Sequence, residues 1–197
     1  MKFNARLFVA ALGLVTVSSS ALASIDVYVG YADGVRAAGF FPSPWSGDSG
    51  VTFFGGSGGS YDAGAIMFVN TGATAANLTA FDVNGYSVWG GLIGAGHSIG
   101  AGQKLILTQT ADYNFDSSDY GWVAPPAVNY TLDGIGHTDM DTGLVLNTHG
   151  FDYAIIGNES FAWRLIGTNG NPSGTPAPAA GITMLLGLAA RARRRRA

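Results

Sequence analysis

The sequence predicts an all-β protein: an antiparallel β-sandwich, immunoglobulin-like or jelly-roll-like, with a short apolar helix expected at each end of the chain. Short apolar or alternating runs recur between residues 24 and 168, and glycine-containing turns separate them. No long stretch in this range has helical periodicity, which favours a sandwich over an α/β fold. A chain of 197 residues is long enough for about one such domain.

The first predicted strand shows the expected pattern most clearly. Val27, Val29 and Tyr31 alternate with Asp26, Tyr28 and Gly30, as a strand with one buried face requires. Nine segments in all are predicted as strands: Ile25–Tyr31, Val51–Phe54, Ala65–Asn70, Leu78–Val83, Tyr86–Trp89, Leu105–Gln109, Val128–Leu132, Tyr153–Ile156 and Phe161–Ile166. Turn signals include Asn84-Gly85, which predicts a hairpin between the fourth and fifth segments, and Asp133-Gly134.

The charges are segregated along the chain. Residues 24–174 contain three cationic side chains and all 13 acidic ones, a net charge of −10. A domain this acidic repels phosphate backbones, so nucleic acid is excluded as an expected partner. The sequence has no cysteine, which excludes a disulfide scaffold, cysteine catalysis and thiolate metal sites.

Residues 1–23 have the features of a secretory signal peptide. Lys2 and Arg6 precede an apolar run from Leu7 to Val17, which is shorter than the roughly 20 residues of a membrane-spanning helix. Ala21 and Ala23 then supply the small-x-small pattern that signal peptidase accepts. We therefore expect export through the Sec translocon and cleavage after Ala23.

The C-terminal region combines a linker, an apolar segment and a basic cluster. Residues 169–175 form a polar, turn-rich linker, and residues 176–178 read Pro176-Ala177-Pro178. The apolar segment 179–190 follows, and as a helix it would span only about 18 Å, too little for a stable anchor. The chain ends with a cluster that the positive-inside bias would hold on the cytoplasmic side: Arg191, Arg193, Arg194, Arg195 and Arg196. This arrangement predicts a transient hold in the inner membrane.

Residues 176–197 resemble the PEP-CTERM sorting signal of Gram-negative, exopolysaccharide-producing bacteria. The matching features are Pro176 and Pro178, the segment Leu185-Leu186-Gly187-Leu188 and the terminal arginines, whereas Ala177 stands where the family usually has Glu. The resemblance implies recognition by a membrane-embedded exosortase, removal of the tail, and delivery to the cell surface or extracellular matrix.

The middle of the chain is similar, more loosely, to lamin-tail-like β-sandwiches of the immunoglobulin type. The similarity covers Gly64 to Thr108 and depends on Ile66–Asn70, Leu78–Phe81 and Ala101–Leu107. The glutamate that this family has in its first strand is absent. The similarity implies the same sandwich architecture that the strand pattern predicts.

One segment places oxygen-bearing side chains at the alternate spacing that suits Ca²⁺. These residues are Asp112, Asn114, Asp116 and Asp119, and Asp139, Asp141 and Thr142 offer a second acidic group further along the chain. Bound cations would also relieve the repulsion within a domain of charge −10. The alternative is a solvated acidic turn whose side chains bond to their own backbone.

Two tryptophans are candidates for stacking against sugar rings. Trp45 and Trp122 lie in loop-like segments, whereas Trp89 and Trp163 lie in predicted strands and are expected in the core. Burial is the alternative for all four. The two loop tryptophans, with calcium, would make a carbohydrate-binding module.

No motif points convincingly to catalysis. Gly55–Gly59 matches G-x-S-x-G, but no helix pattern follows it, and the spacing of His97, His137 and His149 fits no metal motif. Glu159 is the only glutamate and has no evident carboxylate partner, which weakens a glycosidase hypothesis. The favoured hypothesis is an exported, non-enzymatic protein of the surface or exopolysaccharide (biofilm) matrix. The alternatives are the carbohydrate-binding module and, less favoured, a secreted hydrolase.

Overall fold

Every regular element in the described part of the chain is a β-strand. The computed structural model describes residues 23–34, 39–55, 61–85, 87, 93, 96–108, 124–147 and 158–170, all within one unit that comprises residues 21–177. The strands are β1 (Ser24–Asp33), β2 (Val51–Phe54), β3 (Asp62–Asn70), β4 (Ala76–Val83), β5 (His97–Ile99), β6 (Lys104–Leu107), β7 (Ala127–Leu132), β8 (Ile135–Met140) and β9 (Phe161–Gly170). Among these residues there is no helix long and apolar enough to cross a membrane.

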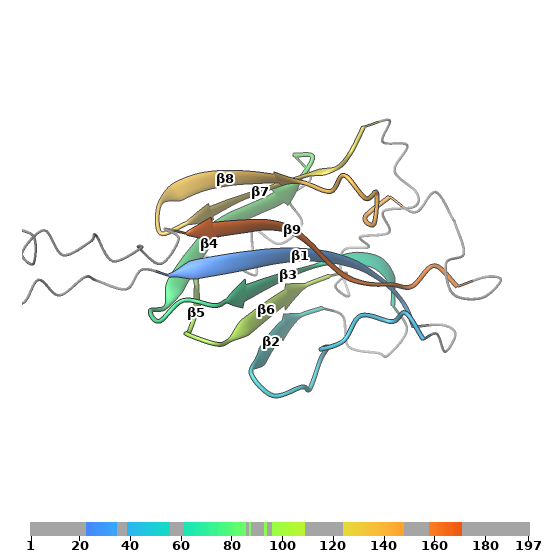
Figure 1. Cartoon of the computed structure of the whole chain (residues 1–197), viewed down its shortest axis with the longest axis horizontal. Helices are drawn as coiled ribbons and strands as arrows, with labels where there is room; N and C mark the ends of the chain where they lie inside the picture. The colour runs from blue at the N-terminus through green and yellow to red at the C-terminus, as the bar shows by residue number, and fades with distance from the viewer. Residues whose placement is uncertain are drawn as a thin grey trace, which may run out of the picture. The chain divides into compact units, whose positions relative to one another are not determined.

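The strands form two sheets (Figure 1). One sheet has five strands in the order β2-β6-β3-β1-β9, and the other has four in the order β5-β4-β7-β8. All neighbouring strands run antiparallel except β2 and β6, which are parallel. The predicted class, all-β with mainly antiparallel sheets, is confirmed. The two helices expected at the chain ends lie outside the described residues.

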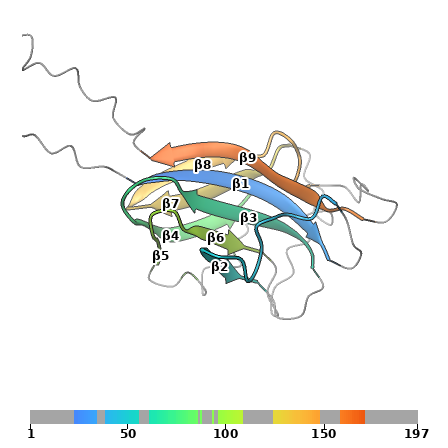
Figure 2. The same ribbon diagram turned by 60° about the horizontal axis from the view of Figure 1, so that its bottom comes forward.

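One hydrophobic core receives side chains from both sheets. Phe68 of β3 makes edge-to-face contacts with Phe81 of β4 and Tyr130 of β7, with ring centroids 5.8 and 5.1 Å apart. The core is dominated by branched and aromatic side chains, which suit a pleated surface: Ile25, Val27, Val29, Ile66, Phe68, Leu78, Phe81, Val83, Ile99, Leu105, Leu107, Val128, Tyr130 and Leu132, among others. In Figure 2, turned from the first view, β4 and β7 lie partly behind β1, β3 and β6.

The outer face of the five-stranded sheet carries one apolar row of side chains. Directly paired residues share a face, so the register places one side chain from each strand in a single row: Phe53, Ile106, Met67, Tyr28 and Leu165. Ile106 is fully buried in spite of its outward direction. Part of this face is covered by Trp45, whose ring lies 5.2 Å from that of Phe53 and 5.8 Å from that of Trp163.

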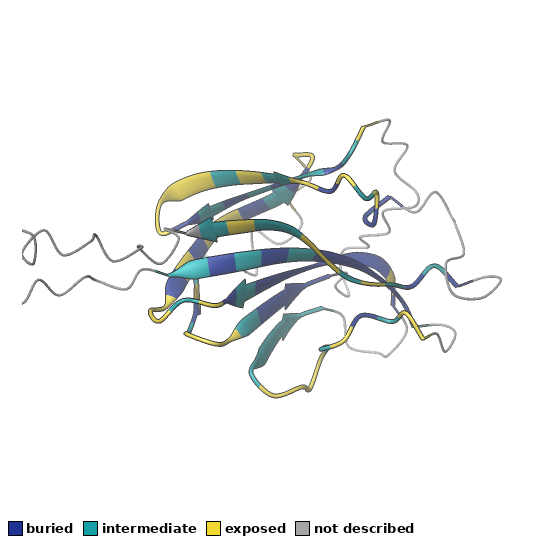
Figure 3. Ribbon diagram, in the orientation of Figure 1, coloured by how far each residue is buried: buried dark blue, intermediate teal, exposed yellow. Residues whose placement is uncertain are grey.

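Seven of the nine predicted strands correspond to strands of the structure. The other two are Tyr153–Ile156, which lies outside the described residues, and Tyr86–Trp89, of which only Ser87 is described. The predicted hairpin therefore stays a prediction. The turn at its centre is present, because Asn84 and Gly85 both have positive φ angles of 51° and 81°. Strands β5 and β8 were not predicted. β5 has three residues, and β8 has no buried residue to produce an apolar pattern (Figure 3).

Asn70, at the end of β3, joins the two sheets through a buried amide. Its Nδ2 donates to the carbonyl oxygens of Ile99 in β5 at 2.7 Å and Thr74 at 2.8 Å. Its Oδ1 accepts from the N–H of Gly72 at 2.9 Å, and the side chain is fully buried. All three bonds go to backbone groups, so the amide satisfies polar atoms that burial would otherwise leave unpaired.

We expect Asn70→Ala to lower the free energy of unfolding by about 3 kcal/mol, because it removes three hydrogen bonds made by a buried amide. Chemical denaturation measures this change. Thr71→Ala is the matched control, since the neighbouring Thr71 is exposed and its hydroxyl makes one bond, to the Ser24 carbonyl at 3.2 Å. The control should cost about 0.5 kcal/mol or less. Equal losses for the two variants would contradict the role given to Asn70.

Candidate functional site

The outer face of the four-stranded sheet carries a shallow trough of about 220 Å³. It crosses β4, β7 and β8 and lies between two rows of side chains that the strand register defines. The first row is Asp82, Asn129 and Thr138, and the second is Ala80, Thr131 and Gly136. The main chain of the residues between the two rows, Phe81, Tyr130 and His137, completes the lining, because their side chains alternate to the opposite face of the sheet.

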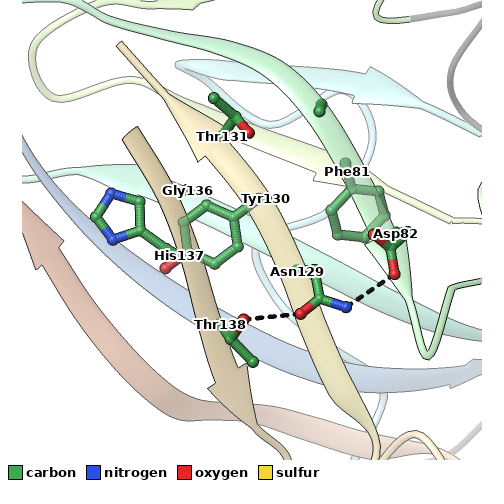
Figure 4. A pocket seen from close by; sticks show the side chains of 9 residues that line it. Phe81, Asp82, Asn129, Tyr130, Thr131, Gly136, His137 and Thr138 are labelled. Atoms are coloured by element: carbon green, nitrogen blue, oxygen red, sulfur yellow. Dashed lines mark hydrogen bonds between the residues drawn. The ribbon is translucent and has the colours of Figure 1, made fainter. Parts of the chain in front are cut away.

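The first row is a chain of hydrogen-bonded side chains (Figure 4). Asn129 donates from Nδ2 to Asp82 Oδ1 at 2.9 Å, and Thr138 donates from Oγ1 to Asn129 Oδ1 at 2.8 Å. The N–H of Gly85 also donates to Asp82 Oδ1, at 2.6 Å, which fixes the carboxylate to the turn after β4. The wall of the trough is therefore held in place before any ligand arrives.

The side chains of the second row are small, so the surface is lower there than at the first row. Ala80 and Gly136 are exposed, and a Cβ atom added at Gly136 would meet no atom within 4 Å. The φ angle of Gly136 is not among the positive ones, so its backbone would accept a side chain without strain. The space above this glycine is open to a bound molecule.

Unused hydrogen-bonding groups remain along the trough. Within the described residues, Asp82 Oδ2 accepts no hydrogen bond and the Thr131 hydroxyl makes none. Asn129 uses one of its two Nδ2 hydrogens for Asp82, which leaves the second one available. Asn129 and Thr131 do not titrate at ordinary pH, so they can act in the trough only as hydrogen-bonding groups.

Behind the trough, a polar clasp connects the four-stranded sheet to β9. Tyr130 donates its hydroxyl hydrogen to Asp139 Oδ2 at 2.5 Å, and Asn169 of β9 donates from Nδ2 to the same carboxylate oxygen at 2.7 Å and to the Tyr130 hydroxyl oxygen. The His137 ring stacks on Tyr130 at 5.3 Å. Burial, followed by the Asp139 hydrogen bond and charge, raises the pKa of Tyr130 far above its usual value. Tyr130 is therefore a stable donor, not an acid or base.

A buried carboxylate lies in the turn after β8. Asp141 is fully buried, and its Oδ2 accepts from the N–H of Leu146 at 2.7 Å. Its Oδ1 is buried with no hydrogen-bond partner among the residues described. Burial raises the pKa of Asp141, while hydrogen bonds from backbone N–H groups and the charge of Arg164 act in the opposite direction.

Trp45 lies in an aromatic cluster on the five-stranded sheet and not in the trough. Four rings surround it at centroid distances between 5.1 and 5.8 Å: Phe41, Phe53, Tyr61 and Trp163. Trp163 was expected in the core, and the structure places it in this outer cluster, where its Nε1 donates to the Pro44 carbonyl at 3.0 Å. Gly30 permits the packing, because a Cβ there would lie 2.9 Å from the Trp163 ring. A role for Trp45 in sugar stacking stays a prediction.

Most of the other predicted site residues lie outside the described residues. They are the calcium candidates Asp112, Asn114, Asp116 and Asp119, the stacking candidate Trp122, the cleavage-site residue Ala21, the motif Pro176-Ala177-Pro178 and the terminal arginines. Ala23 is described and packs, partly buried, against the core. Glu159 is also described, and its N–H donates to Asp33 Oδ2 at 3.2 Å. The described residues contain no group of three or more His, Asp or Glu side chains that could hold a metal ion.

No protein-family model, curated protein or solved structure matches this chain significantly.

The trough was not predicted from the sequence. Its two rows combine residues from three strands, and β8, which contributes Gly136 and Thr138, was not predicted as a strand. The available signal was the turn Asp133-Gly134, where both residues have positive φ angles of 50° and 81°. A hairpin drawn across that turn pairs Asn129 with Thr138 and Thr131 with Gly136, as the structure does.

We expect Asp141→Asn to change how stability depends on pH. The pKa of Asp141 is higher in the folded protein than in the unfolded chain, so the folded state binds more protons once the pH exceeds about 4. The wild-type carboxylate therefore destabilises the fold increasingly as the pH rises from about 4 through the folded pKa, and asparagine does not.

Urea denaturation at pH values from about 4 to 7 measures this effect. The stability of the variant relative to wild type should increase with pH. The test is the slope of this stability difference against pH. Its absolute size is not used, because the new NH₂ group at Oδ1 or Oδ2 could lower stability by about 1–3 kcal/mol at every pH. Thr142→Ala, in the same turn, changes no titratable group, so it is the control and should leave the slope unchanged. A stability difference between Asp141→Asn and wild type that does not change with pH would refute the raised pKa assigned to Asp141.

Proposed function

We propose that this chain is an exported, non-enzymatic protein of the cell surface or exopolysaccharide matrix of a Gram-negative bacterium, with a structural or adhesive role. Its folded unit is proposed to be a β-sandwich of the immunoglobulin-like or jelly-roll-like kind. Export through the Sec translocon, signal peptidase and an exosortase follows from the features of the two chain ends described above.

The observation that supports this proposal is the pairing of Ser24 with Gly170. Ser24 is the first residue of β1 and directly follows the expected cleavage site at Ala23. Gly170 is the last residue of β9 and lies within the linker predicted at 169–175. The start of β1 and the end of β9 are therefore neighbours, as Figures 1 and 2 both show.

This geometry is compatible with removal of both terminal segments. Cleavage after Ala23 leaves β1 whole, and the Ser24 carbonyl keeps its bonds from the N–H groups of Thr71 at 2.8 Å and Gly72 at 3.2 Å. Loss of Ala23 removes only one small, partly buried side chain from the margin of the core. Cleavage near Pro178 lies eight residues beyond the end of β9. A folded unit could thus be released without damage to either terminal strand.

We expect the native protein from an exosortase-containing host to lack residues 1–23 and the tail beyond about Pro178. Intact-mass spectrometry of the cell-surface and culture fractions measures both losses at once. Replacing Arg193, Arg194, Arg195 and Arg196 by serine should prevent C-terminal processing and leave N-terminal processing unchanged, because the positive stop to translocation is lost.

The matched control replaces the same four arginines by lysine, which keeps the positive charge. The lysine variant should be held in the membrane like the wild type. Recovery of the full-length wild-type chain from the cytosol, with both ends intact, would refute the proposal.

A further inference from the structure

We propose that the trough across β4, β7 and β8 binds neutral polysaccharide, by holding two adjacent hydroxyl groups of one sugar ring between Asp82 and Asn129. Thr131 contributes a third hydrogen bond from the opposite row. The site differs from the tryptophan and calcium sites predicted from the sequence. The inference goes beyond the proposed export and does not depend on it, because binding at the trough uses only residues of the folded unit.

The hydrogen-bonding groups left over in the trough match a pair of neighbouring hydroxyls. Asp82 Oδ2 can accept a hydrogen bond from one hydroxyl, and the second Nδ2 hydrogen of Asn129 can be donated to the oxygen of the next one. The two side chains are directly paired across β4 and β7, so these groups lie side by side. A carboxylate oxygen beside an amide N–H therefore offers an acceptor and a donor to two neighbouring hydroxyls.

The pair is held in its geometry before binding. Asp82 is fixed by the N–H of Gly85 at 2.6 Å, and Asn129 is fixed on both sides by Asp82 and Thr138. Little side-chain freedom is then lost when a sugar binds, which favours affinity from a small number of contacts. All three side chains come from strands and not from loops, so the sheet itself sets their separation.

The shape of the trough suits a ligand that lies flat on the sheet. Ala80 and Gly136 leave the second row low, and both are exposed to solvent along with Thr138. The rings of Phe81 and Tyr130 belong to the buried core, so the described lining has no aromatic platform. We therefore expect weak binding per site, with a Kd of roughly 1 mM, which a polysaccharide offsets by presenting many sites along one chain.

Charge selects a neutral ligand. The region from residue 24 to residue 174 has a net charge of −10, and Asp82 itself lies in the wall of the trough. Anionic polysaccharides would be repelled at this position. A metal ion is not favoured either, since Asp82 is the only acidic residue among the described residues that line the trough.

Affinity electrophoresis of the full-length chain tests the proposal. Native gels would contain dextran, galactomannan, hydroxyethylcellulose or arabinoxylan, and a parallel gel would contain alginate as the anionic probe. We expect retardation in at least one neutral gel and none in alginate. Gly136→Val should abolish the retardation, because it fills the open space above the second row. Asp82→Asn should weaken binding about tenfold by removing the charged acceptor.

Thr79→Val is the matched control. It places the same branched side chain at an exposed position of the same sheet, outside the lining of the trough, and should bind like the wild type. Thermal unfolding should show that Gly136→Val folds normally, since valine favours strands and meets no neighbouring atom there.

Should Gly136→Val prove unstable, Gly136→Ser and Asp82→Asn carry the test in its place, by a partial loss of retardation. Any of three results refutes the inference. They are the absence of retardation in every neutral gel, retardation in the alginate gel alone, and full retardation of a folded Gly136→Val variant. None of these results bears on processing of the chain ends, so failure here is distinguishable from failure of the export proposal.

Discussion

The structure depends most on the placement of β1, which is paired on both edges, buried along one face and buried on the other face from Gly30 onward. Nine consecutive residues of β1 pair with β3, and the other edge pairs with β9. On one face Ile25, Val27 and Val29 are fully buried in the core. On the other face Gly30 lies beneath the Trp163 ring, where no larger residue fits. One strand thus fixes the register of the five-stranded sheet, the core and the aromatic layer outside it.

This arrangement makes the two outer faces of the protein unlike. The five-stranded sheet has an apolar row on its outer face, from Phe53 to Leu165, and this row is partly covered by the cluster around Trp45. The four-stranded sheet needs only one apolar face, so its outer face can carry Asp82, Asn129 and Thr131. Polar groups on an uncovered sheet face have no structural task in the core. They are therefore the part of the described surface that is most available for recognition.

The local sequence predicted the strands in which buried and exposed residues alternate. It did not predict strands that lack this alternation. Val27 and Val29 alternate with Asp26 and Tyr28, so β1 was found, and Val51–Phe54 was predicted with the bounds that the structure has. β8 is exposed or half-buried along its whole length and gave no such signal. The trough could not be predicted for a different reason: its wall needs Asp82 to pair with Asn129, which is 47 positions away, whereas only the pair of Asn129 with Thr138 follows from the hairpin at Asp133-Gly134. Pairing between distant strands is a property of the tertiary fold, not of a local pattern.

The clasp of Tyr130, Asp139 and Asn169 connects the trough with the C-terminal end of the folded unit. Asn169 lies one residue before the end of β9, and its amide bonds to the carboxylate that also accepts from Tyr130. Tyr130 is the central strand residue between the two rows of the trough, and Asp139 is next to Thr138 in β8. Removal of residues beyond Gly170 leaves this clasp complete, whereas removal of the end of β9 would take the Asn169 amide from a buried hydroxyl and a carboxylate. The end of β9 is therefore held by polar contacts with the sheet that carries the trough, as well as by pairing with β1.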